Sequence, residues 1–291
     1  MRTVRRIVVM AAILLALGVI EVARAQQPQG EPFTTEIRKL KEGFYVIPGY
    51  DGQITGGNVG VRVTSEGVIL ADSNKIENIA AVISKVKSVT SQPIKYEFGT
   101  HSHADHSAGS AELVKLGTVM ISHRNMRDEM VKGKLASPPS IVFDTQMSLF
   151  LGGAEVRAYH FADPAHTTGD TVVYFPDVRI VQTGDLVLWG KRSNGETLAP
   201  GLTSLKGFIA NADGMLKLDF DMAIPGHGPV LSKEQVQTYR QKLVTLQQRV
   251  ADFIKAGGKK ADLSAKIKLD DLNWPLQQRV LENAYTEAGG K

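Results

Sequence analysis

The feature that most constrains this chain is the segment His101 to His106, which reads HSHADH. It contains three of the seven histidines of the chain, with a carboxylate between them. A β-type run at 94–100 precedes it, so we expect the segment at the end of a strand. Alternate residues that leave a strand point the same way, so His101 and His103 can share one metal ion. Asp105 and His106 face elsewhere from the same loop and predict a second ion nearby.

One short loop cannot supply two coordination shells, so the segment predicts further donors at distant strand ends beside glycine. Three positions fit this description: His166 in the run AHTTGD, Asp185 after Thr183-Gly184, and His227 between Gly226 and Gly228. Each combines a metal donor with a backbone that can turn sharply. We therefore expect these residues to converge on the first loop in the folded chain.

The order of strand-like and helix-like runs predicts an α/β fold. With 291 residues and 43% hydrophobic content, the chain can bury a large core. The same order of elements occurs twice: a strand that ends in an acid, a helix, and a strand that ends in a histidine. The first copy spans 68–72 to 98–101, and the second spans 180–185 to 224–227. A duplicated unit of sheet and helices would place both sets of strand ends along one edge.

Periodicity also predicts the main elements along the chain. Helices are expected over 76–86 with Asn74 as a possible cap, over 107–116, 123–132, 205–216 and 233–256, and over 276–288. Strands are expected at 94–99, 178–183 and 222–225, among others. We expect residues 26–291 to form a single domain that ends in helices.

The first 25 residues have the features of a secretory signal peptide. Three arginines precede the apolar run 7–20, and Ala23-Arg24-Ala25 provides a small-x-small cleavage site. A membrane anchor is the alternative, but this run of 14 residues is shorter than the about 20 needed to span a bilayer. We expect an exported protein, periplasmic or secreted, with no stable membrane anchor after cleavage.

Charge and cysteine content exclude several functions. Removing residues 1–25 takes away four arginines and one glutamate, which leaves 30 basic and 29 acidic side chains. This near-neutral balance gives no support to a nucleic-acid partner. The chain has no cysteine, so it can form neither disulfides nor thiolate ligands. Any metal must be held by nitrogen and oxygen alone.

In these motifs and their order, the sequence resembles the metallo-β-lactamase superfamily. The resemblance covers roughly residues 37–250 and rests on THSHADH at 100–106, His166 with Thr167 and Gly169, Gly184-Asp185, and PGHG at 225–228. It implies a four-layer αββα sandwich of a dinuclear metallohydrolase. It also implies these ligands: His101, His103 and His166 for metal one; Asp105, His106 and His227 for metal two; Asp185 as a bridge.

The resemblance further implies hydrolysis of an activated acyl bond by water that two zinc ions acidify. Asp105 would orient the nucleophile or relay a proton. Iron or manganese also suits such donors. The substrate that the resemblance implies is a small molecule: a β-lactam, lactone, ester or thioester. Asp185 is similar to the acid of hydroxyacylglutathione hydrolases and lactonases, whereas export suits a periplasmic β-lactamase.

Two other functions remain open. One is a mononuclear iron enzyme of the persulfide dioxygenase type, with a His/His/Asp site. The other is a metal-bearing binding protein without turnover. We make no prediction of oligomeric state.

Supporting roles are predicted for several further residues. Asp72 and Asp170 either orient ligand imidazoles or act as caps. His160 either supports a ligand or is a satisfied polar neighbour, and His123 is expected to be a cap or a surface residue. The last set either binds a substrate carboxylate or forms a solvated loop: Trp189, Lys191 and Arg192.

Overall fold

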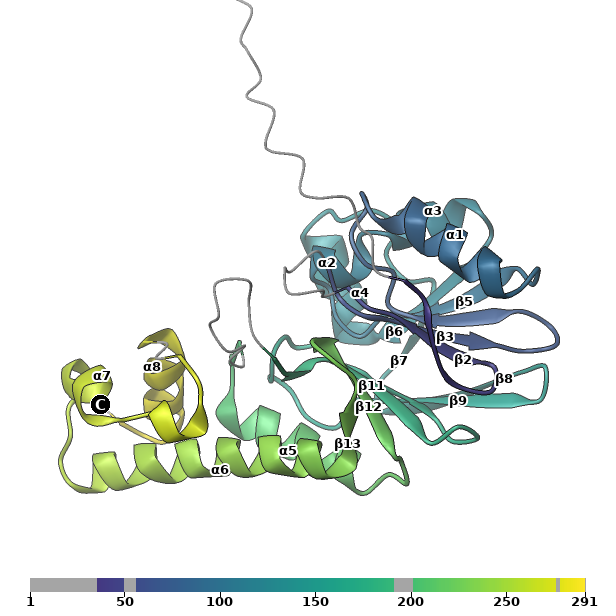
Figure 1. Cartoon of the computed structure of the whole chain (residues 1–291). Coiled ribbons are helices and arrows are strands. Elements are labelled where there is room, and N and C mark those ends of the chain that lie inside the picture. The colour runs from purple at the N-terminus through teal and green to yellow at the C-terminus, as the bar shows by residue number, and fades with distance from the viewer. Residues whose placement is uncertain (1–35, 50–55, 191–200, 276–277, 291) are drawn as a thin grey trace, which may run out of the picture. The chain divides into compact units, whose positions relative to one another are not determined.

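The computed structural model describes residues 36–49, 56–190, 201–275 and 278–290. The predicted signal peptide, Lys191 and Arg192 lie outside these ranges. Phe33–Lys291 forms one compact unit, whose elements are shown in Figure 1. Among the described helices, none combines the length and apolar character needed to cross a bilayer.

The first half of this unit is built on a seven-stranded sheet in the order β1 to β7. Its strands are β1 (Arg38–Lys41), β2 (Phe44–Ile47), β3 (Val59–Val63), β4 (Val68–Ala71), β5 (Ile94–Phe98), β6 (Val119–His123) and β7 (Ile141–Phe143). Neighbours from β1 to β4 are antiparallel, whereas β4 to β7 are parallel. The helices between the parallel strands are α1 (Ile79–Val89), α2 (Ala104–Ser107), α3 (Ser110–Lys115) and α4 (Arg124–Lys132).

The second half is built on a six-stranded sheet in the order β13-β12-β11-β10-β9-β8. Its strands are β8 (Gln146–Leu151), β9 (Ala154–Tyr159), β10 (Val172–Phe175), β11 (Ile180–Leu188), β12 (Met222–His227) and β13 (Leu231–Ser232). Only β11 and β12 pair in parallel, and α5 (Leu205–Leu216) connects them. The remaining helices are α6 (Lys233–Lys255), α7 (Leu263–Lys266) and α8 (Gln278–Glu287).

Three hydrophobic clusters fix the order of the layers. The central cluster joins the two sheets, with Phe44 of β2 against Phe175 of β10 at a ring distance of 4.8 Å. A second cluster packs α1 onto the outer face of the first sheet, and a third packs α5, α6 and α8 onto the second sheet. The helices therefore cover the outer faces of both sheets, as Figure 1 shows. The predicted four-layer αββα sandwich of the α/β class is confirmed.

Local capping explains where the longest helix begins. The Ser232 hydroxyl accepts the backbone N–H of Gln235, and the Gln235 side chain accepts the N–H of Ser232. This capping box satisfies two backbone donors that the first helical turn would leave unpaired. The buried face of α6 then presents Tyr239, Leu243 and Leu246 to the core.

Some predicted boundaries are wrong because of tertiary contacts. The helix expected over 107–116 is divided into α2 and α3 around Gly109, where a Cβ would lie 2.4 Å from the carbonyl oxygen of Ser73. Helix α1 begins at Ile79, because Asn74 adopts a φ of 66° and its side chain closes a turn by accepting from Lys75 N and Asn78 Nδ2. Strand β11 continues to Leu188, beyond its expected end at Thr183.

Candidate metal centre

The first donor loop is fixed at its start by Asp72, which follows β4. The Asp72 carboxylate accepts from the backbone N–H of Thr100 at 2.8 Å and from its hydroxyl at 2.9 Å. Asp72 Oδ2 also lies 2.9 Å from Nδ1 of the buried His106. This is the geometry by which a carboxylate orients a ligand imidazole, leaving Nε2 to face the cluster.

The His166 loop is folded around Asp170. The Asp170 carboxylate accepts the backbone N–H of His166 and of Thr167, each at 2.8 Å, and the Thr167 hydroxyl at 2.9 Å. Asp170 thus caps the loop backbone, which is one of its two predicted roles. Nδ1 of His166 lies 3.1 Å from the carbonyl oxygen of Gly201, which directs Nε2 toward the donor cluster.

Close backbone packing places the donors of the second sheet. Asp185 lies inside β11, just after Gly184 with its φ of 51°, and His227 ends the neighbouring β12. A Cβ at Gly226 would lie 1.9 Å from Oδ1 of Asp185. Only glycine therefore lets the two strands bring these donors together.

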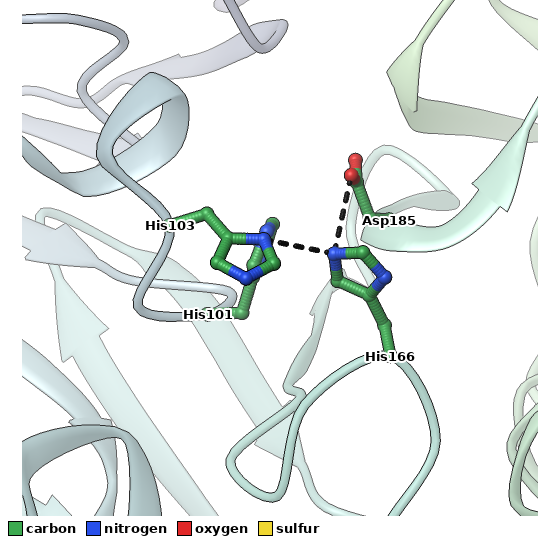
Figure 2. Close-up of side chains that lie close together, drawn as sticks. All are labelled: His101, His103, His166 and Asp185. Carbon is green, nitrogen blue, oxygen red and sulfur yellow. Dashed lines mark hydrogen bonds and ion pairs between the residues drawn. The ribbon is translucent and has the colours of Figure 1, made fainter. Parts of the chain in front are cut away.

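The seven predicted donors form two groups. Within each group the ligand atoms lie within 4.8 Å of one another: His101, His103, His166 and Asp185 in the first group, and Asp105, His106 and His227 in the second. In the first group, His166 Nε2 is 3.0 Å from His103 Nδ1 and 3.4 Å from Asp185 Oδ2 (Figure 2).

Distances in the second group are similar. His227 Nε2 is 3.3 Å from His106 Nε2 and 3.1 Å from Asp105 Oδ2. Oδ1 of Asp185 lies 3.2 Å from His106 Nε2 and 3.5 Å from His227 Nε2. The two oxygens of Asp185 therefore face different donor groups.

These separations fit metal coordination. Zinc–nitrogen bonds of about 2.0–2.1 Å in a tetrahedron place neighbouring ligand atoms about 3.3 Å apart. His101 Nε2 is buried without a hydrogen-bond partner, an arrangement that costs free energy unless an ion is bound there. The residues present thus fit a pair of cations held by nitrogen and oxygen.

The charge states of the donors also suit cations. Burial holds the pKa of His101 well below its usual value, so its imidazole is neutral. Burial opposes ionisation of Asp185, but the nearby imidazoles, His106 first and then His227, together outweigh burial and hold the pKa of Asp185 well below its usual value. For His106, the carboxylates of Asp185 and Asp72 outweigh burial and raise the pKa, so an ion there would replace a proton.

The other two histidines form a stacked pair behind the His166 loop. The rings of His123 and His160 lie 3.7 Å apart with an interplanar angle of 12°. His123 caps α4 by accepting the Asn125 N–H, as expected of a cap, but it is buried, so the surface alternative is wrong. His160 Nδ1 donates to the Asp170 carbonyl at 2.8 Å, which makes it a satisfied polar neighbour that contacts the loop backbone.

Trp189 is half-buried and follows β11 directly. Its backbone N–H donates to the His227 carbonyl at 3.2 Å, and Lys242 Nζ lies 5.5 Å from its ring centroid. Its ring therefore contacts a cation of α6. A substrate contact by Trp189 stays a prediction.

Three residues that support the donors were not predicted. Asn58 Nδ2 donates to the carbonyls of Pro225 and Gly228, on either side of His227. Gln182 Nε2 crosses between the sheets to the carbonyls of Asn58 and Ala71. The sequence feature that could have indicated Gln182 is a side-chain amide inside a mainly apolar strand. Glu129 of α4 accepts hydrogen bonds from Ser102 and Thr168, in two loops that carry donors. Nothing in the sequence distinguishes it from the other charged residues of its helix.

The comparisons with known proteins agree with this fold. The sequence model described as metallo-beta-lactamase superfamily matches residues 76–227, about half of the chain. A metallo-β-lactamase structure from Pontibacter korlensis is similar with a TM-score of 0.62 and 20% identity, over 72% of this chain and 98% of that one. A stereoselective inverting sec-alkylsulfatase from Pseudomonas sp. has a TM-score of 0.69 and 15% identity, over 87% of this chain and 50% of that one.

Two curated relatives are similar in sequence. The 2,4-dinitroanisole O-demethylase subunit alpha of Nocardioides sp. (strain JS1661) is 25% identical over 150 residues, which are 50% of this chain and 44% of that protein. The atrochrysone carboxyl ACP thioesterase of Aspergillus fumigatus is 25% identical over 196 residues, 65% of this chain and 43% of that protein. The chain thus spans about half the length of these relatives.

Proposed function

This chain belongs to the metallo-β-lactamase superfamily, and from that premise we propose that it is a dinuclear zinc hydrolase that cleaves an activated acyl bond of a small molecule. The observation that carries the proposal is the position of Asp185. One of its oxygens lies 3.4 Å from a donor of the first group, and the other lies 3.2 Å from a donor of the second. A carboxylate shared in this way supports two neighbouring ions.

The ligand assignment follows the two donor groups. The first ion would be held by His101, His103 and His166, and the second by Asp105, His106 and His227, with Asp185 between them. Zinc bound at such a site lowers the pKa of a coordinated water to about 7 and polarises a substrate carbonyl.

The side chains of the site differ in how far they reach solvent. His103 is exposed, and Asp105 and His166 are half-buried, whereas the other donors are buried. Structural zinc sites are closed, whereas catalytic sites keep an open position for water or substrate. The side of the centre flanked by His103 and Asp105 is therefore where we place the substrate. Asp105 is positioned there to accept a hydrogen bond from the attacking water.

The substrate class is supported by the donor set and by the relatives. A carboxylate between the two groups, with no cysteine ligand, is the feature that resembles lactonases and thioester hydrolases. Two of the similar proteins are described as a metallo-β-lactamase and an acyl-carrier-protein thioesterase. We propose a lactone, ester, thioester or β-lactam as substrate.

The second donor group supports this proposal over that of a mononuclear iron enzyme. Asp105, His106 and His227 form a set of their own beside the first group. A single-ion enzyme would not need both sets. Metal analysis distinguishes the two, since an iron dioxygenase would contain about one iron and consume oxygen.

The test is to purify residues 26–291, remove metal with a chelator and restore zinc. We expect about two zinc ions per chain, and hydrolysis of at least one member of a panel of lactones, thioesters and a chromogenic β-lactam. Activity should disappear with the metal and return with zinc. Less than one ion per chain would refute the dinuclear site, and full loading without turnover would favour a binding protein.

Export is a separate part of the proposal. The basic residues, apolar run and Ala23-Arg24-Ala25 of the first 25 residues support cleavage after Ala25 and a periplasmic or secreted location. Expression of the full chain in a bacterium, cell fractionation and N-terminal sequencing would test it. A mature protein that begins at Gln26 is expected, and an uncleaved protein in the cytoplasm would refute it.

A further inference from the structure

Glu129 belongs to neither donor group, yet its carboxylate connects the two loops that carry the three histidines of the first group. Oε2 accepts the hydroxyl of Ser102 at 2.6 Å. Oε1 accepts the hydroxyl of Thr168 at 2.6 Å and its backbone N–H at 3.1 Å. Ser102 stands between His101 and His103, and Thr168 follows His166 by two residues. One side chain thus holds both loops at once.

Helix α4, which carries Glu129, is itself fixed against the His166 loop. Asn125 Nδ2 donates to the carbonyl of Thr168 at 2.8 Å. A Cβ at Gly169 would lie 2.4 Å from the backbone nitrogen of Met126, so helix and loop are in close contact. Met126 and Met130 are buried and anchor the helix. Glu129 therefore acts from a rigid support.

We propose that Glu129 is a positioning residue for the first metal site, and this inference rests on the proposed dinuclear centre. Its three hydrogen bonds set the separation of the two loops, and so the 3.0 Å between His103 Nδ1 and His166 Nε2. Charge-assisted hydrogen bonds to a carboxylate are among the stronger ones in proteins. Outer residues that hold metal ligands typically change metal affinity by about 10- to 100-fold when removed.

The proposal predicts an effect on one ion and not on the other. The segment around His227 is held by a different side chain, Asn58, whose amide donates to the carbonyls on either side of it. In the described part of the chain, the second group is also oriented by Asp72 through His106. Loss of Glu129 should therefore weaken the first site selectively.

The experiment measures zinc affinity by competition with a chromogenic chelator, in two backgrounds that each retain one site. His227→Ala disables the second site, and His166→Ala disables the first. In the His227→Ala background, Glu129→Gln should weaken zinc binding by about 10- to 100-fold. In the His166→Ala background it should leave zinc affinity unchanged. Asp128→Asn, the exposed neighbouring carboxylate on α4, is the matched control and should change neither.

Glu129→Gln keeps the size of the side chain, and circular dichroism of the metal-free variants verifies that they are folded. Equal affinity of the Glu129→Gln and Glu129 proteins in the His227→Ala background would overturn the inference. Equal weakening in both backgrounds would do so too, because it would indicate a general structural role. Failure of the unmutated protein to bind two ions would instead overturn the proposed dinuclear function.

A second variant tests the connection itself. Ser102→Ala removes one of the three hydrogen bonds to Glu129 and leaves the backbone of the loop in place. It should weaken the first site less than Glu129→Gln, and the double variant should bind zinc no more weakly than Glu129→Gln alone. Additive losses would show that Ser102 and Glu129 act independently, which contradicts the inference.

Discussion

Glu97 gives a prediction whose magnitude follows from the structure. It lies on β5, between β4 and β6, its side chain is fully buried, and Oε1 accepts the Ser110 hydroxyl at 2.6 Å. Burial raises the pKa of Glu97 from 4.5 to about 7, and the hydrogen bond from Ser110 offsets only part of that effect. The folded chain therefore binds this proton more tightly than the unfolded chain does.

The sign of the effect on stability follows directly. Below about pH 4.5 Glu97 is protonated in both the folded and the unfolded chain, so it does not lower the free energy of unfolding. Because the folded pKa is raised, the free energy of unfolding falls as pH rises from there to about 7. One pKa unit corresponds to about 1.4 kcal/mol, so the full loss above pH 7 is about 3 kcal/mol. Between pH 5.5 and 8 the loss that Glu97 contributes is about 2 kcal/mol.

The assay is urea denaturation at several pH values of the natural chain and of Glu97→Gln, in the same state of metal loading. Glutamine keeps the volume and removes the ionisation. We expect the free energy of unfolding of the natural chain to fall by about 2 kcal/mol more than that of the variant between pH 5.5 and 8. Parallel pH profiles of the two proteins would refute the reasoning, because they would show that Glu97 does not titrate in this range.

Three further predictions concern the metal centre. Gly226→Ala, whose Cβ would lie 1.9 Å from Asp185 Oδ1, should cost about 1–3 kcal/mol in unfolding free energy and lower metal content. Gly117→Ala is strained only by its φ of 92°, because its Cβ meets nothing within 4 Å, and it should keep full metal content. Zinc at about 100 times its dissociation constant should raise the free energy of unfolding by about 2.7 kcal/mol in urea titrations, and no zinc-dependent gain would contradict a folded-state site. Asp170→Ala removes three hydrogen bonds of the His166 loop and should lower kcat/KM about 10- to 100-fold, while Asp144→Asn, exposed and paired with Arg124, should not.

Patterns within short segments were enough to predict the α/β class and the donor residues, and the family resemblance that these segments carry implied the four layers and the two donor groups. The HSHADH segment, and glycine beside Asp185 and His227, combine donor type with backbone freedom in a few adjacent residues. Such signals are local, so they can be recognised without knowing which segments meet. The signal peptide and the periplasmic location stay predictions.

Contacts between distant segments could not be predicted in the same way. Glu129 looks like any charged residue of an amphipathic helix, and its function depends on loops 27 and 39 residues away. In the sequence, Asp170 and Asp72 are both single aspartates next to a strand. In the structure, Asp170 accepts from the backbone of the His166 loop, whereas Asp72 also contacts the imidazole of His106. The choice depends on which strand lies beside each carboxylate, a property of the assembled sheets.

The division of the donors between the two sheets has a consequence for assembly. Each donor group takes members from both sides of the connection between β7 and β8: His101 and His103 with His166 and Asp185, and Asp105 and His106 with His227. Two polypeptides produced by opening that connection would each carry an incomplete set. Cation binding by the mixed fragments would thus show that they have reassembled. Fragments that associate in the wrong relative position would bind neither ion.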